Sequence, residues 1–431
     1  MTERLIIRNF AGLEEVDIEL GRVNIFIGPQ ASGKSVCAKC LYWFKSFLPE
    51  LIASAEAGQD KRAFETSFLN RFTEYFPNLW RSEHFFIIRY EIEQYFIEIA
   101  NDSASGFIPL RLNYSPYFDE EALEIRTTIR ELKNAYEKAT GGRGVSYLAQ
   151  ALKERSATEE PRRRVWKQTG EFSRAEQGFV IAGRAFLSTL KGTVLTFLAA
   201  NPITDPLVRD FLRLYEQIRR EPPSPNVSSQ IHLFGLAESI IRGQLLIEGE
   251  DDYILLADER RIPLANASSG QQEAFSLLMI LLNLVNYDSY ENAGMALYIE
   301  EPEAHLFPES QRAMAQLMAA VYNESVYDIQ YVITTHSPYL LTSFNNLIYA
   351  HQLAQKLHDQ PAKLKALYKV VPKNQQLALA DVRVYGFENG GIKSLIDEET
   401  GLLTADLLDS ASDVTADQFG DLMALDPAIH P

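Results

Sequence analysis

The sequence predicts an α/β fold organised around a loop that binds phosphate. Three observations predict it: the spacing G-x-x-x-x-G-K-S at residues 28–35, the apolar run Val23–Ile27 before it, and the helix-forming run Val36–Phe47 after it. A strand, a glycine-rich loop and a helix in that order are the context in which this spacing binds a nucleotide. We therefore expect a nucleotide to bind here.

Each residue type in this loop suits contact with phosphate. The glycines let backbone N–H groups turn toward phosphate oxygens, and the following helix presents its N-terminus, which favours anions. Lys34 supplies a positive charge for the β- and γ-phosphates, and the Ser35 hydroxyl can ligate Mg²⁺. The predicted nucleotide-binding residues here are Gly28, Pro29, Gln30, Ala31, Ser32, Gly33, Lys34, Ser35 and Val36.

Length and composition narrow the class of protein. The chain has 431 residues, 46% of them apolar and 23% charged, which predicts a soluble globular protein of two or three domains. No apolar run reaches the length of a membrane span, and the start lacks the pattern of a signal peptide, so we expect a cytoplasmic protein with no membrane contact. The net charge of −17 disfavours a broad nucleic-acid-binding surface but leaves room for a local basic groove.

Two local features allow alternative interpretations. Cys37 and Cys40 form Cys-x-x-Cys within the predicted helix; no second pair completes a zinc site, so we expect two buried thiols rather than redox chemistry. A basic cluster between Lys153 and Lys167 includes Arg162, Arg163 and Arg164, with glutamates interleaved. It predicts either a solvated helical face or a surface that binds phosphate or a partner.

The pattern of strands and helices divides the chain into four predicted parts. Residues 1–115 form the first half of the nucleotide-binding domain, with an antiparallel meander after the loop, and residues 116–175 form a charged helical insertion. Residues 176–345 form the second half of that domain. Residues 346–431 form a C-terminal α/β extension with an acidic tail; within it we expect strands at 347–350, 366–371 and 382–387 and a helix at 351–360.

Three further stretches add polar residues to the predicted site. Small residues open an apolar helix at Ser268, Ser269, Gly270 and Gln271, where bare N–H groups can bind an anion. A buried strand, Met295–Ile299, ends in Glu300 and Glu301, of which one can hold Mg²⁺ and the other can polarise the attacking water as a general base. The next strand, Tyr331–Ile333, leads to His336, which can hydrogen-bond a γ-phosphate.

The order of these motifs resembles that of the ABC-type ATPase heads of the SMC/RecF/OLD-like group. The residues 28–35 match its Walker A loop, Ser268–Gln271 its signature, Ile299–Leu306 its Walker B strand with the following D-loop, and Thr335–Pro338 its H-switch. The run Leu5–Phe10 also looks like the group's opening strand, and residues 179–187 look like a strand-plus-arginine segment of its OLD-like branch. Glu300 stands where the wider class has Asp, and no long coiled-coil arm is present.

The resemblance implies an ATPase that uses ATP and Mg²⁺ and works as a homodimer or larger homo-oligomer. Two ATP molecules would lie between two subunits, with Lys34, Ser35, Glu300, Glu301 and His336 acting on the nucleotide of their own chain. Glu301, His336 and Lys34 would be catalytic, and Ser35 and Glu300 would hold the metal. Ser268, Ser269, Gly270 and Gln271 would contact the nucleotide of the other chain.

The same resemblance suggests two biological roles. Stand-alone ATPases of this kind are similar to components of anti-phage systems such as PARIS, Septu and retron-associated systems, in which the ATPase acts as sensor or scaffold for a separate effector, here expected to be a nuclease. The alternative is a RecF-like DNA-binding ATPase of repair and recombination, which the net charge does not favour. The hairpin-like turn Glu248–Asp252 resembles a Toprim nuclease opening only superficially, since no run of βα units follows it.

Overall fold

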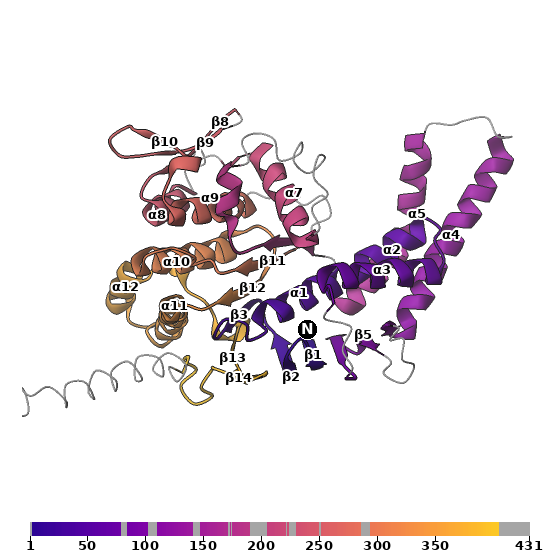
Figure 1. Ribbon diagram of the computed structural model, residues 1–431, viewed down its shortest axis with the longest axis horizontal. Helices are drawn as coiled ribbons and strands as arrows, with labels where there is room; N and C mark the ends of the chain where they lie inside the picture. Colours follow the sequence, from indigo (N-terminus) through magenta and orange to yellow (C-terminus); the bar gives the residue numbers. More distant parts are fainter. Residues whose placement is uncertain are drawn as a thin grey trace, which may run out of the picture.

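The computed structural model describes residues 2–78, 84–101, 110–140, 147–170, 175–189, 205–220, 230–249, 251–285 and 294–404, together with residues 173, 222 and 223. For residues 136–140, 147–157 and 189 it describes the backbone alone. The predicted α/β fold class is confirmed: one large mixed sheet is packed against helices (Figure 1).

Eleven strands of the described part form the large sheet in the order β6-β5-β4-β1-β2-β14-β13-β3-β12-β11-β7. Their bounds are β1 (Glu3–Phe10), β2 (Leu13–Leu20), β3 (Val23–Ile27), β4 (Ile87–Ile92), β5 (Tyr95–Asn101), β6 (Leu110–Tyr114), β7 (Glu176–Val180), β11 (Met295–Glu300), β12 (Ile329–Thr335), β13 (Val382–Glu388) and β14 (Gly391–Ser394). The three short strands β8 (Gln244–Glu248), β9 (Asp251–Leu255) and β10 (Arg261–Pro263) form a second, antiparallel sheet.

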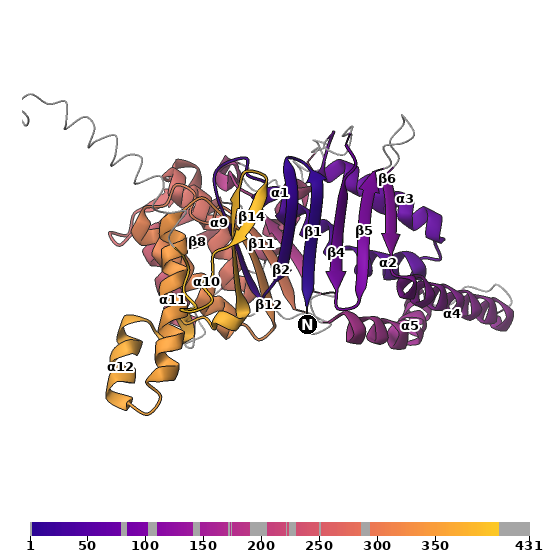
Figure 2. The same ribbon diagram turned by 90° about the horizontal axis from the view of Figure 1, so that it is seen from below.

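The two halves of the large sheet have different burial because they have different strand directions. Strands β13, β3, β12, β11 and β7 run parallel, and every residue of β3 and β12 is buried, as expected for strands covered on both faces. Strands β2, β1, β4, β5 and β6 pair antiparallel and alternate between buried and more exposed residues. Figure 2 shows this half side by side with the parallel half. The carboxyl ends of the parallel strands meet at one edge, where ligands bind in such sheets.

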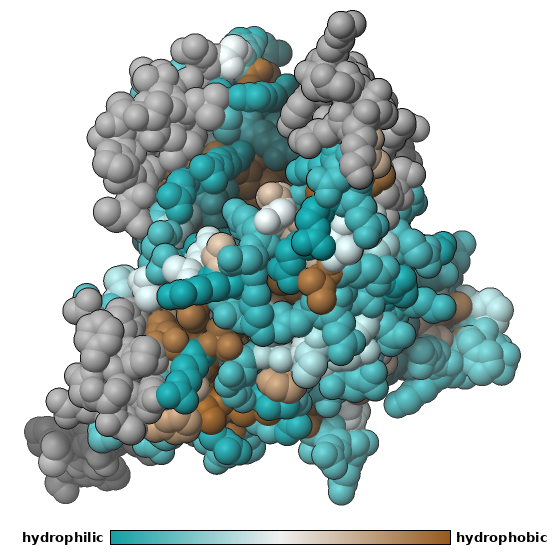
Figure 3. All heavy atoms as spheres, turned by 90° about the vertical axis from the view of Figure 1, so that its right-hand side faces the viewer, coloured by the Kyte–Doolittle hydropathy of each residue, from teal (hydrophilic) through white to brown (hydrophobic). Residues whose placement is uncertain are grey.

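The helices lie around this sheet. They are α1 (Lys34–Lys45), α2 (Phe47–Glu56), α3 (Lys61–Tyr75), α4 (Pro116–Thr140), α5 (Tyr147–Thr169), α7 (Pro206–Arg220), α8 (Ile231–Ile241), α9 (Ser269–Leu284), α10 (Pro308–Glu324), α11 (Pro338–Lys356) and α12 (Pro361–Val370), with a 3₁₀ helix, η3 (Arg184–Thr189). Helices α4 and α5 project from the body as an arm (Figure 1). Hydrophilic residues predominate on the side of the molecule that carries this arm (Figure 3). Among the described residues, no helix is long and apolar enough to cross a membrane.

Aromatic packing fixes α1, the helix behind the phosphate loop. Trp43 is fully buried and its ring stacks on Phe68 of α3 at 4.3 Å between centroids. Cys37 and Cys40 are buried on the same helix, and burial raises the pKa of both thiols. Their environment agrees with the expectation of inert core thiols, because thiolates are the reactive form.

The C-terminal extension differs from the expected elements. Residues 347–350 belong to α11 rather than to a strand, and most of residues 366–371 belong to α12. Helix α11 begins at a Ser337 cap and buries Leu340, Phe344 and Leu347, so its apolar residues follow helical spacing from its start. The strand expected at 382–387 is confirmed as β13, and it lies in the large sheet directly beside β3.

Candidate functional site

The loop between β3 and α1 closes tightly against β13. A Cβ atom on Gly28 would lie 2.4 Å from the backbone oxygen of Phe387, so only glycine allows this approach. Gly33 adopts φ +97 and Ala31 φ +59, both left-handed conformations. Gly33 caps α1 without a side-chain hydrogen bond, so the first turn keeps its backbone N–H groups directed into the loop.

Lys34 is buried and folds back across the loop. Its Nζ atom donates to the backbone oxygens of Gly28 at 2.9 Å and Pro29 at 2.6 Å, and lies 3.5 Å from Nδ1 of His336. Burial lowers the pKa of the Lys34 ammonium to about 8, although the carboxylates of Glu301 and Glu303 oppose the shift. Ser35, the next residue, is exposed at the start of α1. Both side chains can therefore reach a ligand in the loop.

Glu300 and Glu301 lie where β11 ends beside β12. Glu301 adopts φ +44, an unusual conformation for a residue with a side chain, and its N–H donates to the backbone oxygen of Thr334 at 2.9 Å. This turn directs the Glu301 carboxylate toward His336, with 3.3 Å between Oε1 and Nε2. Glu300 accepts a 3.3 Å hydrogen bond from the N–H of Ala182, which follows β7.

Glu303 holds the strand end that carries His336. One of its carboxylate oxygens accepts from the Thr335 hydroxyl at 2.6 Å and from the His336 N–H at 2.8 Å. The other oxygen is buried and has no hydrogen-bond partner among the described residues. The side chain of Glu303 is 8% exposed. A carboxylate in this position fixes the backbone of His336 and adds negative charge beside Lys34.

A fully buried arginine connects β11 to α9. The Arg184 guanidinium donates to the backbone oxygens of Glu300 at 2.7 Å and Glu301 at 3.2 Å, and also to those of Ile181 and Glu273. The Glu273 carboxylate in turn accepts from the N–H groups of Arg184 and Ala185 at 2.8 and 3.1 Å. This pair keeps the start of α9 and the end of β11 in one rigid arrangement.

The small residues at the start of α9 form a capping box. The Ser268 side chain accepts from the N–H of Gln271, and the Gln271 side chain accepts from the N–H of Ser268 at 3.0 Å. Ser268 and Ser269 are exposed, whereas Gly270 is buried: a Cβ atom there would lie 2.6 Å from the backbone oxygen of His305. The two serines can therefore meet an external ligand, while Gly270 permits packing against the turn after β11.

The structure brings together some of the predicted site residues and separates others. Lys34, Glu301 and His336 converge at the carboxyl edge of the parallel strands. Within the described residues, no hydrogen bond or ion pair connects Ser268–Gln271 to the loop of residues 28–35. The start of α9 packs instead against the turn after β11, through Gly270 and His305.

The three arginines of the basic cluster on the arm are each paired with acids, whereas Lys167 is exposed and has no ion pair among the described residues. Arg162 contacts Glu56, Arg163 contacts Glu160, and Arg164 contacts Glu121 and Glu124. Lys153 lies outside the residues whose side chains are described. The pairing favours the solvated-face interpretation over a surface that binds phosphate.

Sequence reasoning assigned no role to Arg184, Glu273 or Glu303. A signal was present for two of them: Arg184 follows a predicted buried strand, and Glu273 directly precedes the apolar run of α9. Charged residues beside buried runs need buried partners, because an unpaired buried charge is costly. The partners lie far apart in the chain, so the sequence alone could not pair them.

Comparison with known proteins gives one partial family match and several similar solved structures. Residues 200–341 match the family model of an AAA ATPase domain. None of the curated proteins compared with the chain is significantly similar to it. Among solved structures, an Smc head bound to the C-terminal winged-helix domain of ScpA is 14% identical, with a TM-score of 0.36, covering 91% of this chain and 97% of that one. The recombination mediator RecF with ATPrS is 13% identical, with a TM-score of 0.28, covering 92% and 98%.

Proposed function

We propose that this protein binds ATP with Mg²⁺ at the loop of residues 28–35 and hydrolyses it. The observation that carries the proposal is the convergence of Lys34, His336 and Glu301, which come from three separate segments of the chain. The His336 ring lies 3.5 Å from Nζ of Lys34 on one side and 3.3 Å from Oε1 of Glu301 on the other. A cation beside a bare helix N-terminus can hold the phosphates, and a carboxylate with a neighbouring imidazole can act on the attacking water and the γ-phosphate.

Each residue has a distinct part in this reaction. Lys34 leaves the carbonyl oxygens of Gly28 and Pro29 and donates instead to oxygens of the β- and γ-phosphates, whose charge it neutralises. The backbone N–H groups of the loop donate to other phosphate oxygens. The Glu301 carboxylate accepts a proton from the water that attacks the γ-phosphorus, while the bond to the bridging oxygen breaks and ADP leaves. His336 hydrogen-bonds the γ-phosphate. Ser35 and Glu300 would hold Mg²⁺, which offsets the charge of the phosphates.

We also propose that the complete site forms between two copies of the chain. Ser268 and Ser269 are exposed, and within the described residues no hydrogen bond connects either of them to the loop of their own chain. The Ser268 N–H donates to Gln271, so it is Ser269, at the same helix start, whose N–H suits a phosphate held by a second copy. ATP would then act as a clamp that sets the assembly state. The wider role of controlling a separate effector protein, such as a nuclease in an anti-phage complex, rests on the family resemblance alone; an adjacent gene for a Toprim or HNH nuclease would support it.

The test compares wild type with Glu301→Gln and Lys34→Ala. We expect E301Q to lower phosphate release by about 10²–10⁴-fold, the usual contribution of a general base, while it still binds a fluorescent ATP analogue. K34A should lose the binding itself. In light scattering, E301Q with ATP and Mg²⁺ should shift to a dimer. Absence of turnover in the wild type would instead support a non-hydrolysing ATP binder, and E301Q that stays monomeric with ATP bound would contradict the shared site.

A further inference from the structure

A concentrated basic surface lies at the far end of α11, away from the ATP site. Residues 338–378 contain five lysines and a single acidic residue, Asp359, whereas the whole chain carries a net charge of −17. All five lysines are exposed: Lys356, Lys363, Lys365, Lys369 and Lys373. Asp359 is paired with His358 at 2.9 Å. Within the described residues, no ion pair neutralises any of these lysines.

Helix α12 carries most of this charge and stands away from the body of the protein (Figure 2). It contains no buried residue, and Val370 at its end is 75% exposed. Leu364 and Leu367 are half-exposed on the same helix. A ten-residue helix with no buried side chain has little tertiary support. We call Lys363, Lys365, Lys369, Lys373, Leu364 and Val370 the α12 surface.

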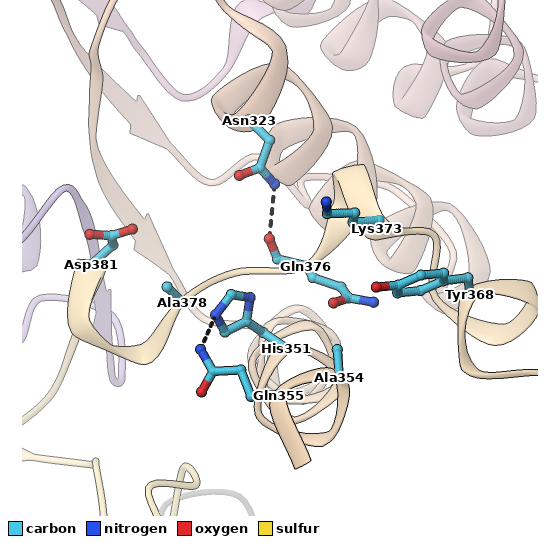
Figure 4. A pocket seen from close by; sticks show the side chains of 9 residues that line it. All are labelled: Asn323, His351, Ala354, Gln355, Tyr368, Lys373, Gln376, Ala378 and Asp381. Atoms are coloured by element: carbon cyan, nitrogen blue, oxygen red, sulfur yellow. Dashed lines mark hydrogen bonds between the residues drawn. The ribbon is translucent and has the colours of Figure 1, made fainter. Parts of the chain in front are cut away.

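A concave region lies at the root of the α12 surface. A cavity of about 340 Å³ is lined by residues of α10, α11, α12 and the segment after them, including His351, Ala354, Tyr368 and Lys373. Figure 4 shows Tyr368 and Lys373 on one side of it and His351 with Gln355 on the other. The surface thus offers positive charge, apolar area and a recess to one ligand.

The chain itself supplies a segment of matching chemistry. Residues 405–431 contain six aspartates and no glutamate, lysine or arginine. Between the aspartates lie apolar residues, among them Leu407, Leu408, Phe419, Leu422 and Met423. Acidic and apolar groups alternate here as cationic and apolar groups do on the α12 surface, so the two are complementary in both properties.

The last described residues lie against α11, so the segment 405–431 begins within reach of the α12 surface. Leu403 donates its N–H to the Asn345 side chain at 2.9 Å, and the backbone oxygen of Gly401 accepts from Gln352 at 3.0 Å. Both partners are on α11, and Gln352 is one helical turn from the end that leads to α12. The 27 residues after Thr404 have a root-mean-square span of roughly 30 Å as a flexible chain. The length of α11, 19 residues or about 28 Å, is within that reach.

We propose that residues 405–431 dock on the α12 surface of their own chain. The aspartates pair with the lysines of α12, and apolar side chains of the segment cover Leu364 and Val370. Nucleic acid fits the surface less well, because a phosphate backbone leaves the leucine and valine uncovered and the rest of the chain is strongly acidic. The docking is independent of the proposed ATPase activity.

Zero-length crosslinking of carboxylates to amines tests the docking in the full chain. An equal mixture of unlabelled and ¹⁵N-labelled protein is treated with a carbodiimide and analysed by mass spectrometry. We expect crosslinks between lysines of α12 and aspartates of 405–431, with both peptides from chains of the same label. Crosslinks mainly between chains of different label would assign the segment to a second copy, and no crosslink at low salt would overturn the docking.

Hydrogen–deuterium exchange supplies a readout that does not depend on crosslinking. Charge reversal by K363E, K365E and K369E together should speed exchange of the α12 amides by about threefold or more, since docked elements open less often. The matched variant K363R, K365R and K369R keeps the positive charge, so its α12 amides should exchange at the wild-type rate. Equal exchange in both variants would contradict the proposal. Slower exchange of α12 on addition of duplex DNA would assign the surface to nucleic acid instead.

Discussion

Glu301 and His336 face each other across the ends of neighbouring parallel strands, with 3.3 Å between Oε1 and Nε2. The two residues are 35 positions apart, yet β11 and β12 run in register with Glu300 opposite Thr334. His336 also lies 3.5 Å from Nζ of Lys34. A carboxylate, an imidazole and an ammonium group therefore form one continuous group at the edge of the sheet.

ATP binding should take up protons at mildly alkaline pH. The pKa of Lys34 is lowered to about 8, so above that pH most of the free protein carries a neutral Lys34 amine. Only the charged ammonium form pairs with the phosphates of ATP. Bound phosphate stabilises the charged form and restores the proton. At pH 8.5 we expect uptake of up to about three quarters of a proton per site, and much less at pH 7.

Calorimetry in two buffers of different ionisation enthalpy measures this uptake. The binding affinity should also fall as the pH rises through 8 toward 9.5, because the cost of protonating Lys34 grows. Equal affinity and no proton exchange across that range would show that Lys34 remains charged in the free protein.

Replacement of the buried arginine should destabilise the protein strongly. Arg184→Met leaves the carbonyls of Glu300 and Glu301 without their guanidinium donor and the Glu273 carboxylate without its cationic partner, and breaking a buried charge pair costs about 3–5 kcal/mol. Denaturant unfolding without nucleotide measures the change. The control is Arg163→Met, whose exposed pair with Glu160 should contribute less than about 1 kcal/mol. Similar losses in the two variants would contradict the role assigned to Arg184.

A methyl group at the start of the phosphate loop should disturb both stability and ATP binding. In Gly28→Ala the new Cβ would meet the Phe387 oxygen at 2.4 Å, so β13 or the loop must shift. Gly235→Ala, inside α8 with no atom within 4 Å of its new Cβ, should instead stabilise by about 0.5–1 kcal/mol. Thermal melting measures the stability of the two variants, and titration with an ATP analogue measures their affinity for the nucleotide. Normal ATP affinity in G28A would show that β13 does not support the loop.

Much of the parallel half of the fold follows from short-range patterns. The apolar runs at 23–27, 295–299 and 331–333 predict three strands, and the structure has them as β3, β11 and β12, the last two slightly longer. The polar residues that follow these runs place Glu300, Glu301 and His336 at one edge. The Toprim nuclease interpretation is not supported, because Glu248 and Asp251 belong to an antiparallel hairpin of β8 and β9 rather than to a run of βα units. Local sequence determines these features.

Long-range pairings could not be predicted in the same way. The strand β13 follows β3 by more than 350 residues and still lies beside it, because its apolar residues complete the parallel half rather than a separate layer. The run 366–371 is β-prone in isolation, but it continues as α12 beside α11. The Arg184–Glu273 pair likewise depends on contacts across 89 positions.

The basic cluster of the arm should contribute little to DNA binding. Because Glu56, Glu160, Glu121 and Glu124 neutralise Arg162, Arg163 and Arg164, replacement of the three arginines by alanine should leave the affinity for duplex DNA within about twofold. A gel-shift assay over a salt series measures it, with melting temperature as a check on folding. Strong, salt-dependent binding that is lost in the variant would favour the RecF-like alternative.

Mixing two inactive variants tests the shared ATP site most directly. Lys34→Ala removes the phosphate contact within a chain, and Ser268→Arg blocks the surface offered to a second chain; each should be inactive alone. In an equal mixture, random pairing leaves about a quarter of the sites intact, each with Lys34 from one chain and Ser268 from the other. We predict that phosphate release returns to about that fraction of wild type in the mixture. A mixture as inactive as its components would contradict the shared site.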